Sequence, residues 1–82
     1  MRLPKRSLER KLLLKIYEKL QERADKNGRV SNADINIILG AMFHIDKEDR
    51  LMVLEKLKKM GLISRIRKRV VIAGYEVELK KG

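Results

Sequence analysis

Arg65, Arg67 and Arg69 alternate with apolar residues in the stretch that follows Gly61. Alternation at every second residue is the pattern of a β-strand with one buried face, so the three guanidinium groups would share the other face. Together with Lys68 they form a row of cations that can contact phosphate groups. Burying these cations would cost too much free energy, and their positive charge is more concentrated than on an ordinary protein surface. The row indicates a binding surface for an anion.

The sequence offers little for catalysis or metal binding. His44 is the single histidine and falls in a turn between helices, where we expect a structural or solvent-exposed role. There is no cysteine, and Asp46, Glu48 and Asp49 lack the glycine and closing glutamate of a calcium loop. No glycine-rich phosphate loop is present. We therefore expect a protein that is not an enzyme and has no metal or cofactor.

The net charge and its distribution point to a polyanionic partner. The chain has 82 residues, which suits one domain, and carries a formal net charge of +10. Residues 1–29 hold ten Lys and Arg against four acids, and residues 56–82 hold nine against two, whereas residues 30–55 hold two against five. This imbalance favours nucleic acid first and an anionic membrane surface second. No apolar stretch is long enough to span a membrane.

The first helix is predicted to begin at Pro4 and Ser7 and to end near Lys26, after a basic arm at residues 1–7 that contains Arg2, Lys5 and Arg6. Its apolar residues cover an arc of about 200°: Leu12, Leu13, Leu14, Ile16, Tyr17, Leu20 and Ala24. Two explanations stay open. The helix is central to a small core, or a second copy of the chain covers Leu8, Leu12 and Leu14.

Two more helices follow a short extended link at Val30. The first has Ser31 as N-cap with Asp34 in capping-box position, and Asp46 with Asp49 repeats this pattern before a helix from Lys47 to Met60. The predicted buried residues of the two helices are Ile35, Ile38, Leu39, Met42, Val53, Leu54, Leu57 and Met60. The predicted solvent-facing residues of the later helix are Lys47, Leu51, Met52, Glu55, Lys58 and Lys59.

The basic stretch is predicted to form a hairpin whose buried face contains Leu62, Ile66, Val70, Val77 and Leu79, with Ile63 on the arginine face. A turn at Ala73-Gly74 would align Val70 with Val77 and Arg69 with Glu78. A turn at residues 67–69 would instead place three cations at the tip. We favour the first turn because residues 70–72 continue the strand propensity up to the glycine.

The run "LEKLKKMGLISR" followed by "YEVEL" resembles the "L-x-x-L-x-x-x-G-L-I-x-R … Y-x-L" pattern of winged helix-turn-helix domains in many bacterial and archaeal regulators. The order of the predicted elements matches that fold over nearly the whole chain. In size and basic wing the sequence is similar to small stand-alone proteins of archaea, their plasmids and viruses. The resemblance implies an α+β fold of three helices, a short strand and a C-terminal hairpin wing, formed as one domain over residues 1–82.

The resemblance also implies how the protein would bind duplex DNA as a homodimer. The third helix would lie in the major groove and the wing would reach the backbone or the minor groove. The expected DNA contacts are Lys47, Leu51, Met52, Glu55, Lys58 and Lys59 on the third helix, Arg65, Arg67, Lys68 and Arg69 on the wing, and Arg2, Lys5 and Arg6 on the arm. The acidic start of the third helix departs from this pattern and puts sequence-specific reading in doubt.

We expect a nucleoid-associated cytoplasmic DNA-binding protein, either a transcription regulator or a non-specific chromatin factor. A module that docks to ribosome, polymerase or replication machinery is the alternative, favoured by Leu51, Met52 and the acidic middle of the chain. RNA binding is a third possibility. The chain has few aromatic residues (Tyr17, Phe43 and Tyr75), which argues against stacking on single strands, so RNA would be held by shape and charge.

Overall fold

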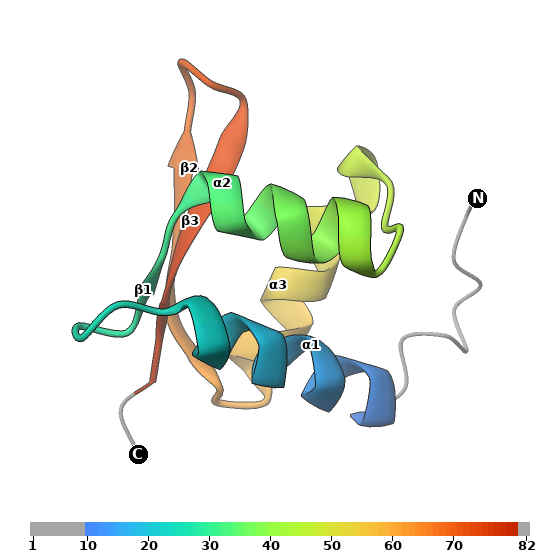
Figure 1. The fold of residues 1–82 in the computed structure, drawn as a ribbon, viewed down its shortest axis with the longest axis vertical. Coiled ribbons are helices and arrows are strands. Elements are labelled where there is room, and N and C mark those ends of the chain that lie inside the picture. Colours follow the sequence, from blue (N-terminus) through green and yellow to red (C-terminus); the bar gives the residue numbers. More distant parts are fainter. Residues whose placement is uncertain (1–9, 81–82) are drawn as a thin grey trace.

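The computed structural model describes residues 10–80 and shows an α+β fold with helices on one side of a small antiparallel sheet (Figure 1). Its elements in chain order are α1 (Arg10–Arg23), β1 (Arg29–Val30), α2 (Asn32–Ile35), η2 (Asn36–Met42), η3 (Lys47–Asp49), α3 (Arg50–Lys59), β2 (Ile63–Arg69) and β3 (Gly74–Leu79). The predicted arm, the predicted helix start at Pro4 to Ser7, and Leu8 lie outside the described residues.

The core lies between the helices and the inner face of the sheet. Three residues of α1 are buried in it, Leu13, Ile16 and Leu20, at the helical spacing of one face. The predicted buried residues of the next two helices are confirmed for Ile35, Ile38, Leu39, Val53, Leu54 and Leu57. Met60 is only partly buried, and the prediction for Met42 is wrong, since 42% of that side chain is exposed.

The α2 helix begins as the sequence predicts. Ser31 has an extended backbone and its Oγ accepts a hydrogen bond from the Asp34 N–H at 3.3 Å. The same helix then continues as the π-helical η2, in which Met42 points away from the core because the extra residue per turn rotates the later side chains.

Asp46 is the N-cap residue of the next helical segment, as predicted, but its side chain makes no capping hydrogen bond. The third helical segment opens instead with the short 3₁₀ turn η3, and regular α-helix starts only at Arg50.

The sheet has the strand order β1–β3–β2, with both pairs antiparallel. Val30 pairs with Val77, and Ile66 also pairs with Val77 from the other side. Val30 and Val77 are almost fully buried, so the centre of the sheet closes the core. Because β1 has only two residues, no third strand of residues 10–80 lies beside the outer half of the β2–β3 hairpin.

The position of the hairpin turn corrects both sequence alternatives. Arg69 pairs with Gly74, so the turn consists of residues 70–73, and the predicted pairing of Val70 with Val77 is wrong. Ala73 adopts a left-handed backbone conformation with φ 50°, which is usually found at glycine. Gly74 is the first residue of β3, where a side chain has no room because the Asn32 side chain occupies the space that a Cβ would fill.

A bulge at the start of β2 corrects the predicted arginine face. Ile63 pairs with Leu79 and Arg65 pairs with Glu78, so Ser64 is an extra residue between two consecutive pairs. The extra residue reverses the alternation, which places Ile63 in the core with 2% of its surface exposed. Ile63 was predicted on the arginine face.

Within residues 10–80, no helix is long and apolar enough to cross a membrane.

Candidate nucleic-acid interface

The outer face of the sheet carries alternating cations and carboxylates rather than an unbroken row of arginines. Arg65 pairs in register with Glu78, and Arg67 with Glu76. Glu78 also forms an ion pair with Arg29 on β1, whose Nε donates a hydrogen bond to Glu78 Oε1 at 3.0 Å.

A second, looser ion pair joins Arg69 and Glu76 at 3.8 Å. On this face the two glutamates therefore offset part of the charge of Arg29, Arg65, Arg67 and Arg69. Among the residues that the structure describes, no ion pair reaches Arg65 or Arg67. Their guanidinium groups are exposed and are the cations of this face best able to contact a phosphate.

Basic side chains extend from both faces of the hairpin. Successive side chains of a strand point to opposite sides, so Lys68 lies on the helix side of β2 while Arg67 and Arg69 lie on the outer side. Lys68 is exposed, although its β3 partner Tyr75 packs partly against the core. The four predicted wing residues are thus all at the surface, but they do not form a single row.

The tip of the hairpin is apolar, which the sequence reasoning missed. Val70, Val71 and Ile72 are exposed by 79%, 98% and 53%, although Val70 was predicted to be buried. Figure 1 shows this turn projecting past α2, beyond any helix that could cover it. The sequence carried no signal for this exposure, because it depends on where the neighbouring helices end in space.

The outer surface of the third helical segment largely matches the prediction. Lys47, Met52, Glu55, Lys58 and Lys59 are exposed, and Leu51 is half-buried. The charges are divided along the helix axis, since Glu48 and Asp49 stand at its start and Lys58 and Lys59 in its last turn. The acids near the N-terminal end and the cations near the C-terminal end interact favourably with the helix dipole. This arrangement therefore stabilises the helix whatever it binds.

Arg50 holds the turn between η2 and α3 and is a structural residue that the sequence did not reveal. Its Nε donates to the carbonyl of Ile45 at 3.2 Å, and another guanidinium nitrogen donates to Asn36 Oδ1 at 3.0 Å. The guanidinium lies so close over Gly40 that a Cβ there would approach it to 2.7 Å. Arg50 therefore fixes the angle between the two helical segments and is not available to a ligand.

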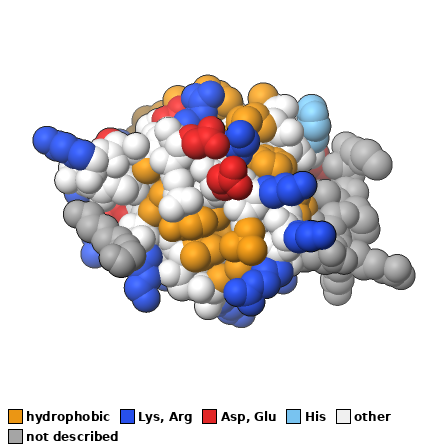
Figure 2. Space-filling view, turned by 60° about the horizontal axis from the view of Figure 1, so that its bottom comes forward, with side chains coloured by type: hydrophobic (Ala, Val, Ile, Leu, Met, Phe, Trp, Pro, Cys, Tyr) orange, Lys and Arg blue, Asp and Glu red, His pale blue; other side chains and the backbone are white. Residues whose placement is uncertain are grey.

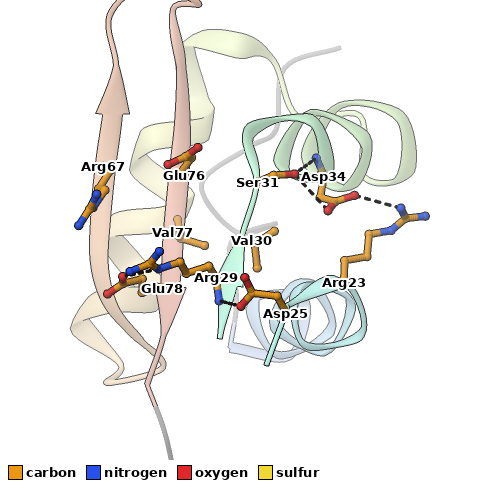
Figure 3. A pocket seen from close by; sticks show the side chains of 10 residues that line it. All are labelled: Arg23, Asp25, Arg29, Val30, Ser31, Asp34, Arg67, Glu76, Val77 and Glu78. Carbon is orange, nitrogen blue, oxygen red and sulfur yellow. Dashed lines mark hydrogen bonds and ion pairs between the residues drawn. The ribbon is translucent and has the colours of Figure 1, made fainter. Parts of the chain in front are cut away.

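A cavity of about 320 Å³ lies beside the outer face of β1 and β3 (Figure 3). Two ion pairs are part of its lining, Arg23 with Asp34 at 3.2 Å and Arg29 with Glu78 at 3.0 Å. Within residues 10–80, no cluster of His, Asp or Glu side chains suits a metal ion. The charged groups of this cavity compensate one another, which leaves little net charge to attract a ligand.

Asp25 at the rim of this cavity has a structural role. Its Oδ1 accepts hydrogen bonds from the N–H of Arg29 at 2.9 Å and of Asn27 at 2.8 Å. These bonds favour the ionised form and hold the pKa of Asp25 below its ordinary value, the bond from Arg29 being the larger cause. The carboxylate thereby shapes the turn that leads into β1.

The surface that includes α1 has an apolar centre. Figure 2 shows hydrophobic side chains gathered in the middle of the face that comes forward when the lower part of Figure 1, where α1 lies, is turned to the viewer. Leu14 is 40% exposed, while Leu12 and Tyr17 pack partly against the core. The core therefore accounts for much of the broad apolar arc of this helix, but not for Leu14.

No protein-family model matches the chain, and no curated protein or solved structure does either.

Proposed function

We propose that this protein is a winged helix-turn-helix protein that binds double-stranded DNA through α3 and the β2–β3 hairpin, which we call the wing. The observation that carries the proposal is the exposed set of wing cations, Arg65, Arg67, Lys68 and Arg69, on a hairpin that projects from a helical body. The element order and the net charge of +10 support it. Its role is binding rather than catalysis.

Phosphate contacts would supply most of the affinity. Each neutralised phosphate releases condensed counterions, so the affinity should fall steeply as the salt concentration rises. The interleaved Glu76 and Glu78 offset part of the wing charge, which makes Arg65 and Arg67 the strongest candidates for phosphate contacts on the outer face. Arg2, Lys5 and Arg6 of the arm would add to this term.

The decisive experiment is a salt titration of binding. Anisotropy with duplex DNA, single-stranded DNA and RNA should rank the duplex first, and replacing Arg65, Arg67 and Arg69 by Ala should weaken binding to all duplex sequences. The slope of log affinity against log salt should fall by about one unit for each lost phosphate contact. A matched control replaces three exposed cations away from the wing, Lys11, Lys15 and Lys26, by Ala.

Two results would contradict the wing model. Equal losses in the wing and control variants would mean that net charge alone drives binding. Unchanged binding by a folded wing variant would place the interface elsewhere.

Selectivity should be modest because few side chains on α3 suit base edges. The η3 turn at the start of the segment is acidic, and the exposed residues in the middle of the segment are Met52, Glu55 and Lys56. A good bidentate base contact contributes roughly 1–3 kcal/mol of discrimination, so one or two weaker contacts give a short and degenerate motif. Selection from random duplexes should return such a motif, and replacing Lys47 and Lys59 together by Ala should remove it.

We also propose that the protein acts as a homodimer through α1. The support is the 40% exposure of Leu14 on an apolar face. A dimer would place two α3 helices roughly 34 Å apart and make the DNA site a palindrome. Light scattering should give twice the chain mass, and Leu14→Glu should give a monomer that stays folded. A wild-type monomer at millimolar concentration would refute the dimer.

Docking to another protein is the second candidate function. The acidic η3 turn that precedes α3, together with the exposed Met52, favours it, since acidic side chains repel DNA phosphates. The same titration separates the two functions. A protein-docking module would show no preference for duplex over single strands, and any binding at low salt would be lost equally in the wing and control variants.

A further inference from the structure

The wing tip has a composition that phosphate binding does not explain. Val70, Val71 and Ile72 are consecutive, β-branched and exposed, and Val71 has 98% of its surface in solvent. A wing that only contacts phosphates would gain from polar or basic residues there. Three apolar side chains at the most protruding point of a highly charged protein indicate a surface that is covered when the protein binds its partner.

The tip stands on a firmly held base. Asn32 of α2 accepts a hydrogen bond from the Tyr75 N–H at 3.0 Å, and its side chain packs against the backbone of Gly74. Below the turn, the two strands of the hairpin pair without interruption from Arg65–Glu78 to Arg69–Gly74. The hairpin is therefore anchored to the helical body directly below the turn, and the apolar residues are presented in a defined direction.

Cations flank the tip on both sides. Arg69 precedes Val70 directly and faces outward, whereas Lys68 faces the helix side. At about 3.3 Å of rise per strand residue, both cations sit within roughly 10 Å of the tip along the hairpin. A groove with a phosphate backbone along each of its two walls is complementary to this arrangement, because each face of the hairpin meets one wall.

We propose that the wing tip is an apolar wedge that enters the minor groove of duplex DNA, partly unstacks one base step and bends the helix axis. This proposal rests on the proposed DNA-binding function and gives the wing a second role besides phosphate binding. The minor groove of B-DNA is about 6 Å wide, and two paired strands are about 4.8 Å apart before their side chains are counted. The tip therefore enters only a groove that is widened, and widening accompanies a kink toward the major groove.

The proposal also predicts where the wedge enters. Pyrimidine–purine steps such as TA are the easiest to unstack, so they should be the preferred sites of insertion. Selectivity of this kind arises from deformability and needs no base contact from α3. It agrees with a third helix whose exposed residues offer few contacts to base edges.

The test measures affinity and bending separately. The probe is a duplex with donor and acceptor dyes at its ends and 2-aminopurine at a central TA step, titrated with the full chain. Wild-type protein should shorten the end-to-end distance, with a bend on the order of 20–90°, and raise the 2-aminopurine fluorescence. Replacing Val70, Val71 and Ile72 together by Ser should abolish both signals at saturating protein and weaken binding about tenfold.

Three variants separate the wedge from other effects. Val71→Ser alone should reduce the bend with a smaller loss of affinity. Arg65, Arg67 and Arg69 replaced together by Ala should bind weakly and yet bend DNA at saturation. Ile37→Ser removes a 40% exposed apolar side chain from η2 and should change neither signal. All tip substitutions are at exposed positions, so melting temperatures should confirm that each variant is folded.

Each remaining outcome overturns the wedge in a distinguishable way. Salt-dependent duplex binding without bending or unstacking would leave the DNA-binding function standing and remove the wedge. Failure to bind any duplex would remove both. Binding to vesicles of anionic phospholipid that requires Val71, with no bending of DNA, would assign the tip to a membrane surface instead.

Discussion

The two ends of the wing contain the same kind of residue and place it in opposite surroundings. At the base, Ile63, Val77 and Leu79 are buried against the helices. At the tip, Val70, Val71 and Ile72 are exposed, and no helix of residues 10–80 covers them. Both ends contain β-branched residues, which have a high propensity for strands. Whether such a side chain is buried depends on whether a helix packs against it. The base contributes to the stability of the fold, and the tip is free to contribute to binding.

The largest expected difference between the two ends is in stability. Ile63→Ala should lower the free energy of unfolding by about 2–5 kcal/mol, since it leaves a cavity beneath the sheet. Val71→Ala should change it by less than about 0.5 kcal/mol. Urea denaturation of both variants measures the contrast, and equal effects would show that the tip is packed in solution.

A second expected effect concerns the junction between base and tip. Gly74→Ala should destabilise the protein by about 1–3 kcal/mol, because the new methyl group displaces the Asn32 side chain and leaves the Tyr75 N–H unpaired. In the double variant with Asn32→Ala the methyl group has room. Its loss of stability should therefore be smaller than the sum of the two single losses, and simple additivity would contradict this packing.

Smaller still is the expected contribution of the ion pair at the outer face of the base. Arg29 and Glu78 are 59% and 25% exposed, and pairs this accessible contribute about 0.2–1 kcal/mol. A double-mutant cycle with Arg29→Ala and Glu78→Ala should give a coupling in this range that shrinks as salt is added. A coupling that salt does not alter would indicate a pair shielded from solvent.

The smallest expected effect is an acid dependence at the turn before β1. The pKa of Asp25 is lowered in the folded protein, so its ionised form stabilises the fold above the ordinary aspartate pKa. That stability is lost as the pH falls through the lowered pKa. Asp25→Asn should therefore flatten the dependence of the melting temperature on pH between about pH 5 and pH 2. An unchanged profile would assign the acid sensitivity to other carboxylates.

The sequence by itself determined the elements that depend on local patterns. Helical spacing predicted the buried faces of the α2–η2 and α3 segments except at Met42 and Met60. The Ser31 cap predicted the start of α2, and alternation predicted a basic hairpin after Gly61. The expected order of elements follows from these signals. They are readable because each depends on residues only a few positions apart.

Only the tertiary structure decided the register, the turn and the partners of the cations. The bulge at Ser64 reverses the alternation that placed Ile63 among the arginines. Asn32, which lies 43 positions before Tyr75, bonds the Tyr75 N–H beside Gly74, where the strand pairing ends and residues 70–73 form the turn. The exposure of Val70 depends on where the neighbouring helices end. These outcomes depend on contacts between segments far apart in the chain, to which hydrophobic periodicity is insensitive.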